Sequence, residues 1–316
     1  MNKTEGILDV FSPNIEGYPF YYTSRPAVFS FLSDRQLSLA APFLAYWFLS
    51  LFFHLLDLGR WPWIEKFRIQ EPDEVVSRNK ATVGQVVRSV LLQQILQTVG
   101  GLWWLNSLET EGDYIVDHNQ AMKNLYRVVF RALEIFIGWE TTRDTLDVCG
   151  PALVSILYWW FIPIIQLLFA LLFMDTWQYF IHRFFHTNQY LYRTIHSVHH
   201  RLYVPYAFGA LYNHWLEGLL LDTLGAAVAH SLASMSMRQA ILLFTIATLK
   251  TVDDHCGYSL PFDPFQILFP NKAAYHDIHH RIWGIKYNFS QPFFIHWDVI
   301  LNTRYRGAPP TKTKHA

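Results

Sequence analysis

Three stretches of hydrophobic residues dominate the pattern of the chain, and each is long enough to form a membrane-spanning helix. A bilayer is crossed by about 20 helical residues, a length that Leu37–Leu58, Val83–Leu105 and Pro151–Met174 all reach. Pro151–Met174 contains no charged residue, whereas Arg88 and several glutamines interrupt Val83–Leu105. A span with such polar residues is expected to face protein rather than lipid. The pattern predicts an all-α fold in the form of a polytopic membrane helical bundle.

Two further stretches are predicted to be helical without simply crossing the membrane. Residues 216–252 are apolar but are broken by Asp222, Gly225 and the polar run "SMSMRQ", which predicts a hairpin of two short helices that enters the membrane and returns. Residues 117–137 are amphipathic, because apolar side chains recur at helical spacing. We expect this helix to lie along the membrane surface or to pack on the bundle. Its apolar positions are Leu125, Val128, Val129, Leu133 and Ile137.

Composition agrees with lipid contact and argues against nucleic-acid binding. Charged side chains make up 16% of the residues, against about 25% in a typical soluble domain. Lys+Arg and Asp+Glu are equal at 25 each, so no basic field exists to hold a nucleic acid. Cys149 and Cys256 form no CxxC pair and predict neither a disulfide framework nor a zinc knuckle. The segment before the first apolar stretch lacks the features of a secretory signal peptide, so membrane insertion is expected to come from internal segments.

The distribution of basic residues predicts the orientation in the membrane. Cytosolic loops are enriched in lysine and arginine, and the loop after the first apolar stretch is rich in both, whereas residues 106–148 hold more acids than bases. Counting spans from that loop places residue 175 onward on the cytosolic face. The basic residues concerned are Arg60, Lys66, Arg68, Arg78 and Lys80.

Histidines form the most specific pattern in the chain. Three clusters occur in the second half, "HRFFH" from residue 182, "HSVHH" from residue 196 and "HDIHH" from residue 276. On a helix, residues three and four apart share a face, so we expect each cluster to direct its imidazoles at one place. Neutral imidazole is a good ligand for zinc, copper or iron. The clustered residues are His182, His186, His196, His199, His200, His276, His279 and His280.

The number of histidines indicates two metal ions rather than one. A zinc site is satisfied by about four ligands, and eight are too many for a single ion. Adding His255 from "DDHCGY" gives nine, which suits two ions with positions left open for dioxygen. Carboxylates that accept the second ring N–H of a ligand are expected close by. The nearby candidates are Asp175, Asp253, Asp254, Asp277 and Asp298.

Other histidines carry a weaker signal. His214 in "LYNHWLEG" is either a ligand or substrate contact or a packing residue, and Asp175 is either a cap or a carboxylate that supports a ligand. His230 lies inside the apolar hairpin and is interpreted as structural. The remaining histidines stand alone and are interpreted in the same way, namely His54, His118, His296 and His315.

The order HxxxH, HxxHH, HxxHH on an apolar chain resembles the fatty acid hydroxylase and sterol desaturase superfamily of membrane di-iron oxygenases. Four stretches, "DTWQYFIHRFFH", "LYRTIHSVHHRLYVPYAFGALYNH", "LKTVDDHCGY" and "YHDIHHRIWGIKYNFSQPFF", are similar to the sphingolipid C4-hydroxylases of fungi and plants. His255 corresponds to the lone histidine of that family. Trp215 departs from it, since proline is expected after His214, and this bears on the shape of the substrate channel.

The resemblance implies a function and its accessories. It implies a monooxygenase that uses two iron ions and O2 to hydroxylate carbon 4 of sphinganine or dihydroceramide, with a cytosol-facing, histidine-rich helical catalytic cap. Electrons are expected from NAD(P)H through a separate cytochrome b5 and its reductase, because no haem-binding HPGG is present. The ending "KTKHA" fits a dilysine signal of endoplasmic-reticulum membrane proteins, with Lys312 and Lys314. The expected location is that membrane, with the histidines in the cytosol.

The domain prediction follows from these segments. We expect an N-terminal segment over 1–36, transmembrane and interfacial helices over 37–174, a di-iron catalytic domain over 175–306 that includes the hairpin at about 216–252, and a tail over 307–316.

Several alternative functions are compatible with the histidine pattern. Other enzymes of the superfamily would use the same histidines as ligands, whereas a metal transporter would need only their ability to bind metal. A C4-methylsterol oxidase, a sterol C5-desaturase and a fatty acyl hydroxylase of the same superfamily would use the same ligands, so the stretch "RLYVPYAFGALYNH" has to distinguish them. A histidine-lined metal transporter would place its ligands inside the spans, whereas these clusters flank them. A non-catalytic scaffold is expected to lack some of the histidines.

Overall fold

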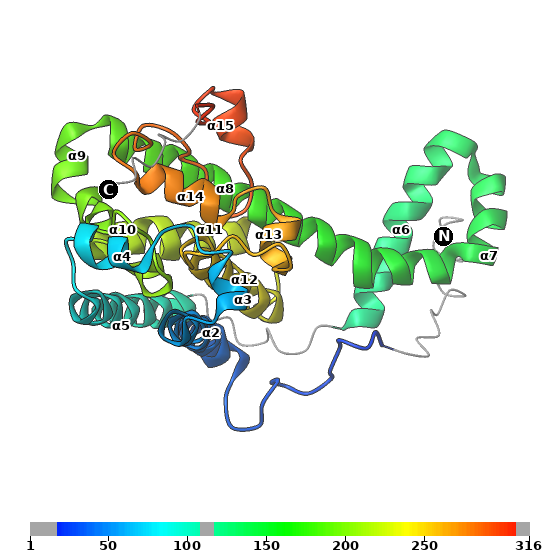
Figure 1. The fold of residues 1–316 in the computed structure, drawn as a ribbon. Helices are drawn as coiled ribbons and strands as arrows, with labels where there is room; N and C mark the ends of the chain where they lie inside the picture. Colours follow the sequence, from blue (N-terminus) through cyan, green and yellow to red (C-terminus); the bar gives the residue numbers. More distant parts are fainter. Residues whose placement is uncertain (1–17, 108–116, 308–316) are drawn as a thin grey trace. The chain divides into compact units, whose positions relative to one another are not determined.

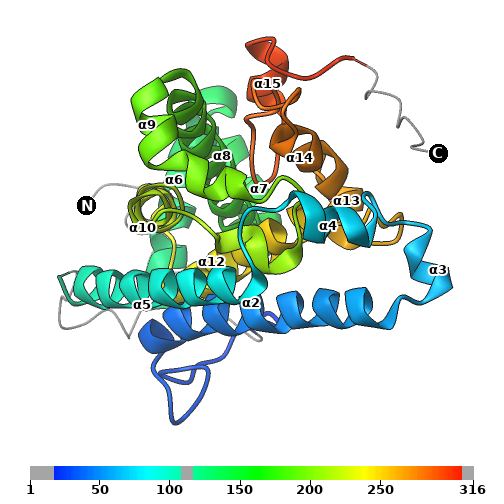
Figure 2. The ribbon, with the colours of Figure 1, turned by 60° about the vertical axis from the view of Figure 1, so that its left-hand side comes forward.

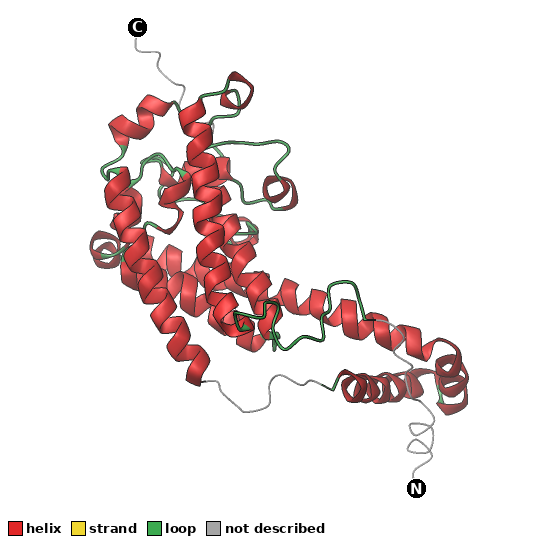
Figure 3. Cartoon of the chain, turned by 90° about the horizontal axis from the view of Figure 1, so that it is seen from below, coloured by secondary structure: helices red, strands yellow, loops and turns green. Residues whose placement is uncertain are grey.

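The computed structural model describes residues 18–107 and 117–307, and these form helices joined by loops (Figure 3). No strand occurs among them, and backbone pairing is limited to isolated bridges such as that between Arg68 and Tyr258. The all-α prediction is therefore confirmed for the described part of the chain. The predictions for residues 1–17 and for the tail with Lys312 and Lys314 fall outside the described residues.

The chain divides into two compact units. One comprises Met1–Asp34 and Ser107–Leu168, and the other comprises Arg35–Asn106 and Phe169–Ala316. Every predicted metal-binding histidine belongs to the second unit.

In the first unit, helix α6 (His118–Ile137) packs against helix α7 (Trp139–Ile156), which continues into the π-helical segment η1 (Leu157–Phe161). Asp117 caps α6 by accepting a hydrogen bond from the backbone N–H of Gln120, which satisfies one of the free donors of the first turn. The amphipathic helix predicted here is therefore present.

The face of α6 that packs differs in part from the predicted one. Met122, Tyr126 and Phe130, spaced four residues apart, are the fully buried positions, whereas Val128 and Ile137 remain exposed. Residues four apart stay on one helical face. The five apolar positions predicted from the sequence spread over a wider part of the helix circumference than the part that α7 covers.

The second unit contains the remaining helices (Figure 1). Helix α2 (Asp34–Gly59) and helix α5 (Val83–Ser107) run side by side in both Figure 1 and Figure 2, and the indole N–H of Trp47 donates to Gln94 across them, at 2.9 Å. The long helix α8 (Ile162–Thr187) enters this unit at Phe169. The shorter helices in chain order are α3 (Pro62–Glu65), α4 (Pro72–Arg78), α9 (Gln189–Thr194), η2 (His196–Arg201), η3 (Ala207–Leu211), α10 (Trp215–Gly218), η4 (Leu219–Leu224), α11 (Gly225–Leu232), α12 (Met237–Asp254), α13 (Pro264–Leu268), α14 (Ala273–His280) and α15 (His296–Ile300).

The core of this unit fixes the segment that follows the second histidine cluster. Residues 202–212 pack in one buried cluster with side chains of α2, α5 and the end of α12. Tyr46 of α2 donates to the carbonyl of Phe208 at 2.7 Å, so the buried hydroxyl is satisfied. The stretch "RLYVPYAFGALYNH" is thus part of the hydrophobic core as well as the segment expected to distinguish substrates.

Two helical runs are long and apolar enough to cross a bilayer. They are α2 and the continuous helix Trp139–Thr187, which contain the predicted spans 37–58 and 151–174. On α2 one side packs inward while Leu44 and Phe48 stay exposed, as expected of side chains that contact lipid. Helix α5 covers the third predicted stretch, but it does not reach the same apolarity.

The predicted hairpin forms two helical arms. The first is the run α10–η4–α11, and the second is α12. Ser236 and Gln239 build a capping box at the start of α12, so the polar run "SMSMRQ" acts as the turn and helix start between the arms. Gly218 allows the first arm to approach α5 closely, since a Cβ atom there would lie 2.3 Å from the side chain of Gln93.

Candidate metal centre

The nine predicted histidines come from four places in the second unit. The first cluster lies on α8 and the second on η2, while His255 follows the last residue of α12 and the third cluster occupies α14. All nine side chains are buried except that of His186, which is half-buried. These segments are far apart in sequence, and the fold brings their rings together.

The nine histidines form two groups that each can hold a metal ion. Within each group the ring nitrogens lie within 4.8 Å of one another. We call the two sets group A and group B. Group A is His182, His186, His196, His200 and His279, and group B is His199, His255, His276 and His280.

The two HxxHH clusters are each divided between the groups, so the expectation that each cluster points at one place is wrong. In the third cluster His276 and His280 belong to group B and His279 to group A. Residues four apart are separated by about 40° around a helix, whereas adjacent residues diverge by about 100°. The adjacent histidine therefore reaches the other group. The second cluster shows the same grouping, with His196 and His200 in group A and His199 in group B, although η2 is a 3-10 helix to which these α-helical angles do not apply.

The rings of both groups face one another through Nε2. In group A the Nε2 atoms of His182 and His196 are 3.1 Å apart, and those of His186 and His196 are 2.7 Å apart. In group B the Nε2 of His276 lies 3.1 Å from that of His255 and 3.0 Å from that of His280. Two nitrogens at about 2.1 Å from one metal ion and at right angles to each other are separated by about 3.0 Å, which matches these spacings.

The opposite ring nitrogen, Nδ1, points outward to a backbone carbonyl in five of the nine. Examples are His182 to Phe289 at 2.8 Å and His279 to Tyr287 at 2.7 Å. A carbonyl only accepts, so Nδ1 carries the proton and Nε2 keeps its lone pair. Several lone pairs then meet with no proton between them, an arrangement that a cation stabilises. The other three bonds of this kind are His199 to Tyr212, His255 to Thr251 and His280 to Leu202.

Burial keeps the rings neutral. It lowers the pKa of His199 to about 3 and that of His255 to about 4, because an imidazolium loses its hydration inside the protein. The pKa of His276 is lowered well below its ordinary value for the same reason, with its histidine neighbours adding to the effect. Neutral rings at physiological pH are in the form that binds metal.

Glu217, on α10, is a site residue that sequence reasoning missed. Its Oε1 lies 2.5 Å from Nδ1 of His196, and both side chains are almost completely buried. A carboxylate that accepts the outer N–H of a metal ligand orients the ring and raises its basicity. The available signal was that Glu217 is one of two acidic residues, with Asp222, in a mostly apolar arm, since a buried carboxylate needs a partner.

Asp175 and Asp298 act on the loop that carries the carbonyl of Phe289. Asp175, on α8, accepts from the backbone N–H groups of Phe293 and Phe294. Asp298 accepts from the backbone N–H groups of Phe289 and Ser290, at 3.0 and 2.8 Å. Neither carboxylate touches a histidine of the two groups through a described hydrogen bond. Both hold the loop that in turn holds His182.

The other sequence candidates lie around the groups. Asp254 forms a buried ion pair with Lys250, and Asp277 accepts from Gln70 and Arg281. Asp253 accepts from Gln266. His214 lies outside both groups and caps α10, where its Nδ1 accepts from the backbone N–H of Leu216 at 3.3 Å.

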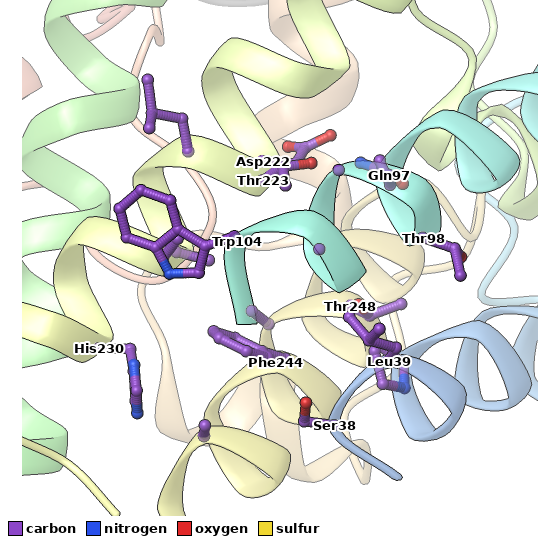
Figure 4. A pocket seen from close by; sticks show the side chains of 18 of the residues that line it. Ser38, Leu39, Gln97, Thr98, Trp104, Asp222, Thr223, His230, Phe244 and Thr248 are labelled. Carbon is purple, nitrogen blue, oxygen red and sulfur yellow. The ribbon is translucent and has the colours of Figure 1, made fainter. Parts of the chain in front are cut away.

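A large apolar cavity, whose lining side chains are shown in Figure 4, ends beside the histidines. Its volume is about 330 Å³, and its walls come from α2, α5, α8 and both arms of the hairpin. A second hollow of about 20 Å³ adjoins it, with three histidines of group B and one of group A in its wall. Three polar residues line both spaces and mark their junction, namely Gln178, Asp222 and Thr251.

Two helices lead from the apolar cavity to the metal centre. Along α8, Met174 lines the cavity, Gln178 the junction, and His182 belongs to group A. Along α12, Thr251 lines the junction and is followed four residues later by His255 of group B. Residues four apart share a helical face, so α8 presents apolar, polar and metal-binding side chains in order, and the end of α12 leads from a polar side chain to a metal-binding one. The arrangement suits oxidation of a long apolar chain near its polar end.

The chain is similar in sequence to one known protein family and to several individual proteins. The sequence model of the fatty acid hydroxylase family matches residues 167–303. The chain is 45% identical over 276 residues to the sphingolipid C4-hydroxylase of Saccharomyces cerevisiae, covering 87% of this chain and 73% of that protein. It is 42% identical over 272 residues to sphinganine C4-monooxygenase 2 of Arabidopsis thaliana, covering 86% of this chain and 88% of that protein.

A third relative bears a different name. The chain is 41% identical over 273 residues to the very-long-chain aldehyde decarbonylase GL1-9 of Oryza sativa subsp. indica, covering 86% of this chain and 90% of that protein. No solved structure matches the chain.

Proposed function

The chain belongs to the fatty acid hydroxylase family, and from this premise we propose that it is a sphingolipid C4-hydroxylase. The reaction is the oxygen-dependent insertion of a hydroxyl group at carbon 4 of sphinganine or dihydroceramide. The observation that carries the proposal is the gathering of nine histidines into two adjoining groups at the end of an apolar cavity. The similarity to two proteins named for this reaction supports the choice of substrate.

Groups A and B are proposed to hold two iron ions. The convergence of unprotonated Nε2 atoms fits two cations, and the rings of the groups adjoin, with the centroids of His200 and His280 4.9 Å apart. When bound, the two irons would supply the activation of dioxygen and the oxidation of a C–H bond. The chain's own residues hold the rings in place, chiefly Glu217 behind His196 and the backbone carbonyls behind five of the other histidines.

The hydrocarbon tail of the substrate is proposed to occupy the apolar cavity. The cavity is lined by residues such as Leu39, Trp104 and Phe244 (Figure 4), so a tail bound there is removed from water, which is favourable in proportion to its apolar area. With the tail in place, the carbons next to the polar end lie at the junction, beside the histidines. Group B supplies most of the histidine wall there.

The enzyme is proposed to be a multi-pass protein of the endoplasmic-reticulum membrane. The two candidate spans and the apolar hairpin support membrane insertion, and lateral entry from the bilayer suits a lipid substrate. A cytosolic position for the histidines is supported by direct contact with the basic loop that follows α2, since cytosolic loops are enriched in lysine and arginine: the backbone N–H of Lys80 donates to the carbonyl of Arg201 at 2.8 Å, and Gln70 donates to Asp277 at 2.9 Å. Each turnover needs two electrons in addition to O2, and a separate cytochrome b5 with its NAD(P)H-dependent reductase is the proposed source.

Within this proposal the domains keep their predicted limits. Residues 37–174 are the transmembrane and interfacial helices, and residues 175–306 are the catalytic domain, with the hairpin at about 216–252. Residues 1–36 and 307–316 flank them.

The test is expression in cells that lack phytosphingosine, followed by mass spectrometry of their lipids. Appearance of the 4-hydroxy long-chain base supports the proposal. An unchanged profile of long-chain bases with altered sterols would instead point to a methylsterol oxidase or a sterol desaturase.

A second candidate function is aldehyde decarbonylation, favoured by the name of the rice relative. The same histidines and the same apolar cavity would serve it. The two functions differ in product, because decarbonylation converts a long-chain aldehyde to a hydrocarbon that is one carbon shorter. Supplying the same cells with a labelled aldehyde separates them.

A further inference from the structure

Asp222 occupies the point where the apolar cavity meets the metal centre. It lies in η4, a π-helical segment of the first hairpin arm, and lines both the large cavity and the small hollow beside the histidines. Figure 4 shows it next to Thr223 at one end of the cavity, with Ser38 and His230 away from it. π-Helical turns are rare overall, and those that do occur are often found at functional sites.

The carboxylate of Asp222 has no partner in the part of the chain that the structure describes. No hydrogen bond or ion pair engages it, and its Oδ2 is buried. The side chain of Gln178, four residues before His182, is likewise unpaired within the described residues and borders the same two spaces. Buried polar groups are usually hydrogen-bonded, so an unpaired carboxylate at a cavity junction, with an amide side chain beside it, indicates a polar ligand.

A second carboxyl group lies in the same hollow. Glu217 shares the small hollow with Asp222, and its Oε2 is also unpaired among the described residues. No arginine or lysine lines that hollow in the described chain. A buried carboxyl group without a hydrogen-bond partner is costly, and a ligand that donates hydrogen bonds to Asp222 and brings a positive charge into contact with it would offset this cost.

We propose that Asp222, assisted by Gln178, binds the protonated amino group of a free long-chain base. This inference rests on the proposed function and makes it more specific. In sphinganine the amino group is on carbon 2, and only carbon 3 separates its carbon from the carbon that is hydroxylated. A carboxylate at the junction therefore places carbon 4 at the histidine wall while the tail fills the apolar cavity.

The free base fits this site better than dihydroceramide does. In dihydroceramide the nitrogen is an uncharged amide that bears a second acyl chain. An amide can donate one hydrogen bond to Asp222, but it brings no positive charge to pair with that carboxylate. A hydrogen bond to a charged group contributes about 1.5–3 kcal/mol, which corresponds to about 10- to 100-fold in affinity.

The experiment compares two substrates in the full-length protein in lipid nanodiscs, supplied with a reducing system. The substrates are sphinganine and N-acetylsphinganine, which differ in the charge of the nitrogen. We expect Asp222→Asn to lower kcat/KM for sphinganine by about 10- to 100-fold and to change that for N-acetylsphinganine less than threefold, with unchanged iron content. Asp222→Glu, which keeps the charge, should retain the preference for the free base.

The controls separate substrate recognition from support of the metal centre. Asp144→Asn removes an exposed carboxylate of α7 and should leave both substrates unaffected. Asp222→Ser is measured beside Asp222→Asn, so that a folding defect of one variant does not decide the result. The inference is overturned if Asp222→Asn lowers kcat/KM equally for both substrates, if that variant loses iron, or if its preference for the free base is the same as that of the unmodified protein. If the unmodified protein hydroxylates neither substrate, the proposed function itself has failed. The measurement on the unmodified protein therefore distinguishes failure of the function from failure of the inference about Asp222.

Discussion

Glu217 and His196 form a buried carboxylate–imidazole pair in which Oε1 and Nδ1 are 2.5 Å apart. The pair joins the first hairpin arm to the second histidine cluster. Its effect is to fix the ring of His196 with Nε2 toward the other histidines of group A, so a residue of an otherwise apolar helix takes part in holding the metal centre.

Replacing Glu217 with alanine is therefore expected to impair the metal centre. The carboxylate that orients His196 is lost, and changes of this kind cost about 10- to 100-fold in metal affinity or activity. Iron per chain and the rate of 4-hydroxylation are to be measured together. Glu140→Ala, an exposed acid of α7, is the matched control. Full iron content and full activity in the Glu217 variant would contradict a supporting role.

Adjacent histidines are expected to affect different metal ions. His199 belongs to group B and His200 to group A, although they are neighbours in sequence. Each single alanine variant should lose one of the two ions and all hydroxylation activity, while the double variant should lose both ions. Elemental analysis of the purified protein measures this.

His214→Ala is the control for the histidine variants, because His214 lies outside both groups and caps α10. It should retain both ions. The metal must be identified as well as counted, since zinc binds nitrogen ligands more tightly than Fe(II) does. Loss of both ions in each single variant would show that the groups do not bind separately.

Asp175→Ala is expected to destabilise the loop behind His182. Two backbone N–H groups, those of Phe293 and Phe294, lose their buried acceptor, which costs about 3 kcal/mol and lowers the unfolding midpoint by roughly 5–10 °C. Thermal unfolding in detergent measures the change. Asp175→Asn, which keeps one acceptor oxygen, should lose less. An unchanged midpoint in both variants would mean that the loop is held by other contacts.

Narrowing the apolar cavity is expected to change the preferred chain length. Ala227 lines the cavity one helical turn before His230, which Figure 4 places away from Asp222. Ala227→Phe should reduce hydroxylation of an eighteen-carbon base and spare a shorter one, because the tail loses room while the junction is unchanged. The ratio of products from a mixture of bases measures this. Val148→Phe, at an exposed position of α7, should leave the ratio unaltered.

Sequence spacing predicted the set of histidines because metal ligands have to come from a few residue types at helical intervals. All nine are found in the two groups. Helical spacing accounts for the division of the third cluster on α14, but it did not predict that of the second cluster, because η2 is a 3-10 helix and its grouping depends on how η2 packs against α8 and α14. Glu217 was missed for the same reason: its partner His196 is distant in sequence and becomes its neighbour only when the hairpin arm folds back.

The fold was predictable where the pattern was long and unmixed. The apolar stretches around α2 and α8 and the hairpin broken by "SMSMRQ" all form helices. The packed face of α6 was predicted less well, since Val128 and Ile137 are apolar yet exposed. Hydrophobic spacing identifies an amphipathic helix, but the partner helix selects which part of its apolar arc is covered.

The division of the histidines of η2 and α14 between the two groups determines when, during synthesis of the chain, metal ions can be bound. Each segment gives histidines to both groups, and α14 follows every other histidine of the set in the chain. While the ribosome is still synthesising residues before His276, neither group has its full complement, whatever has already folded. Both ions must therefore be acquired late, after the last histidine cluster has emerged and docked, and a chain interrupted before that point would have no complete metal site to protect it from degradation.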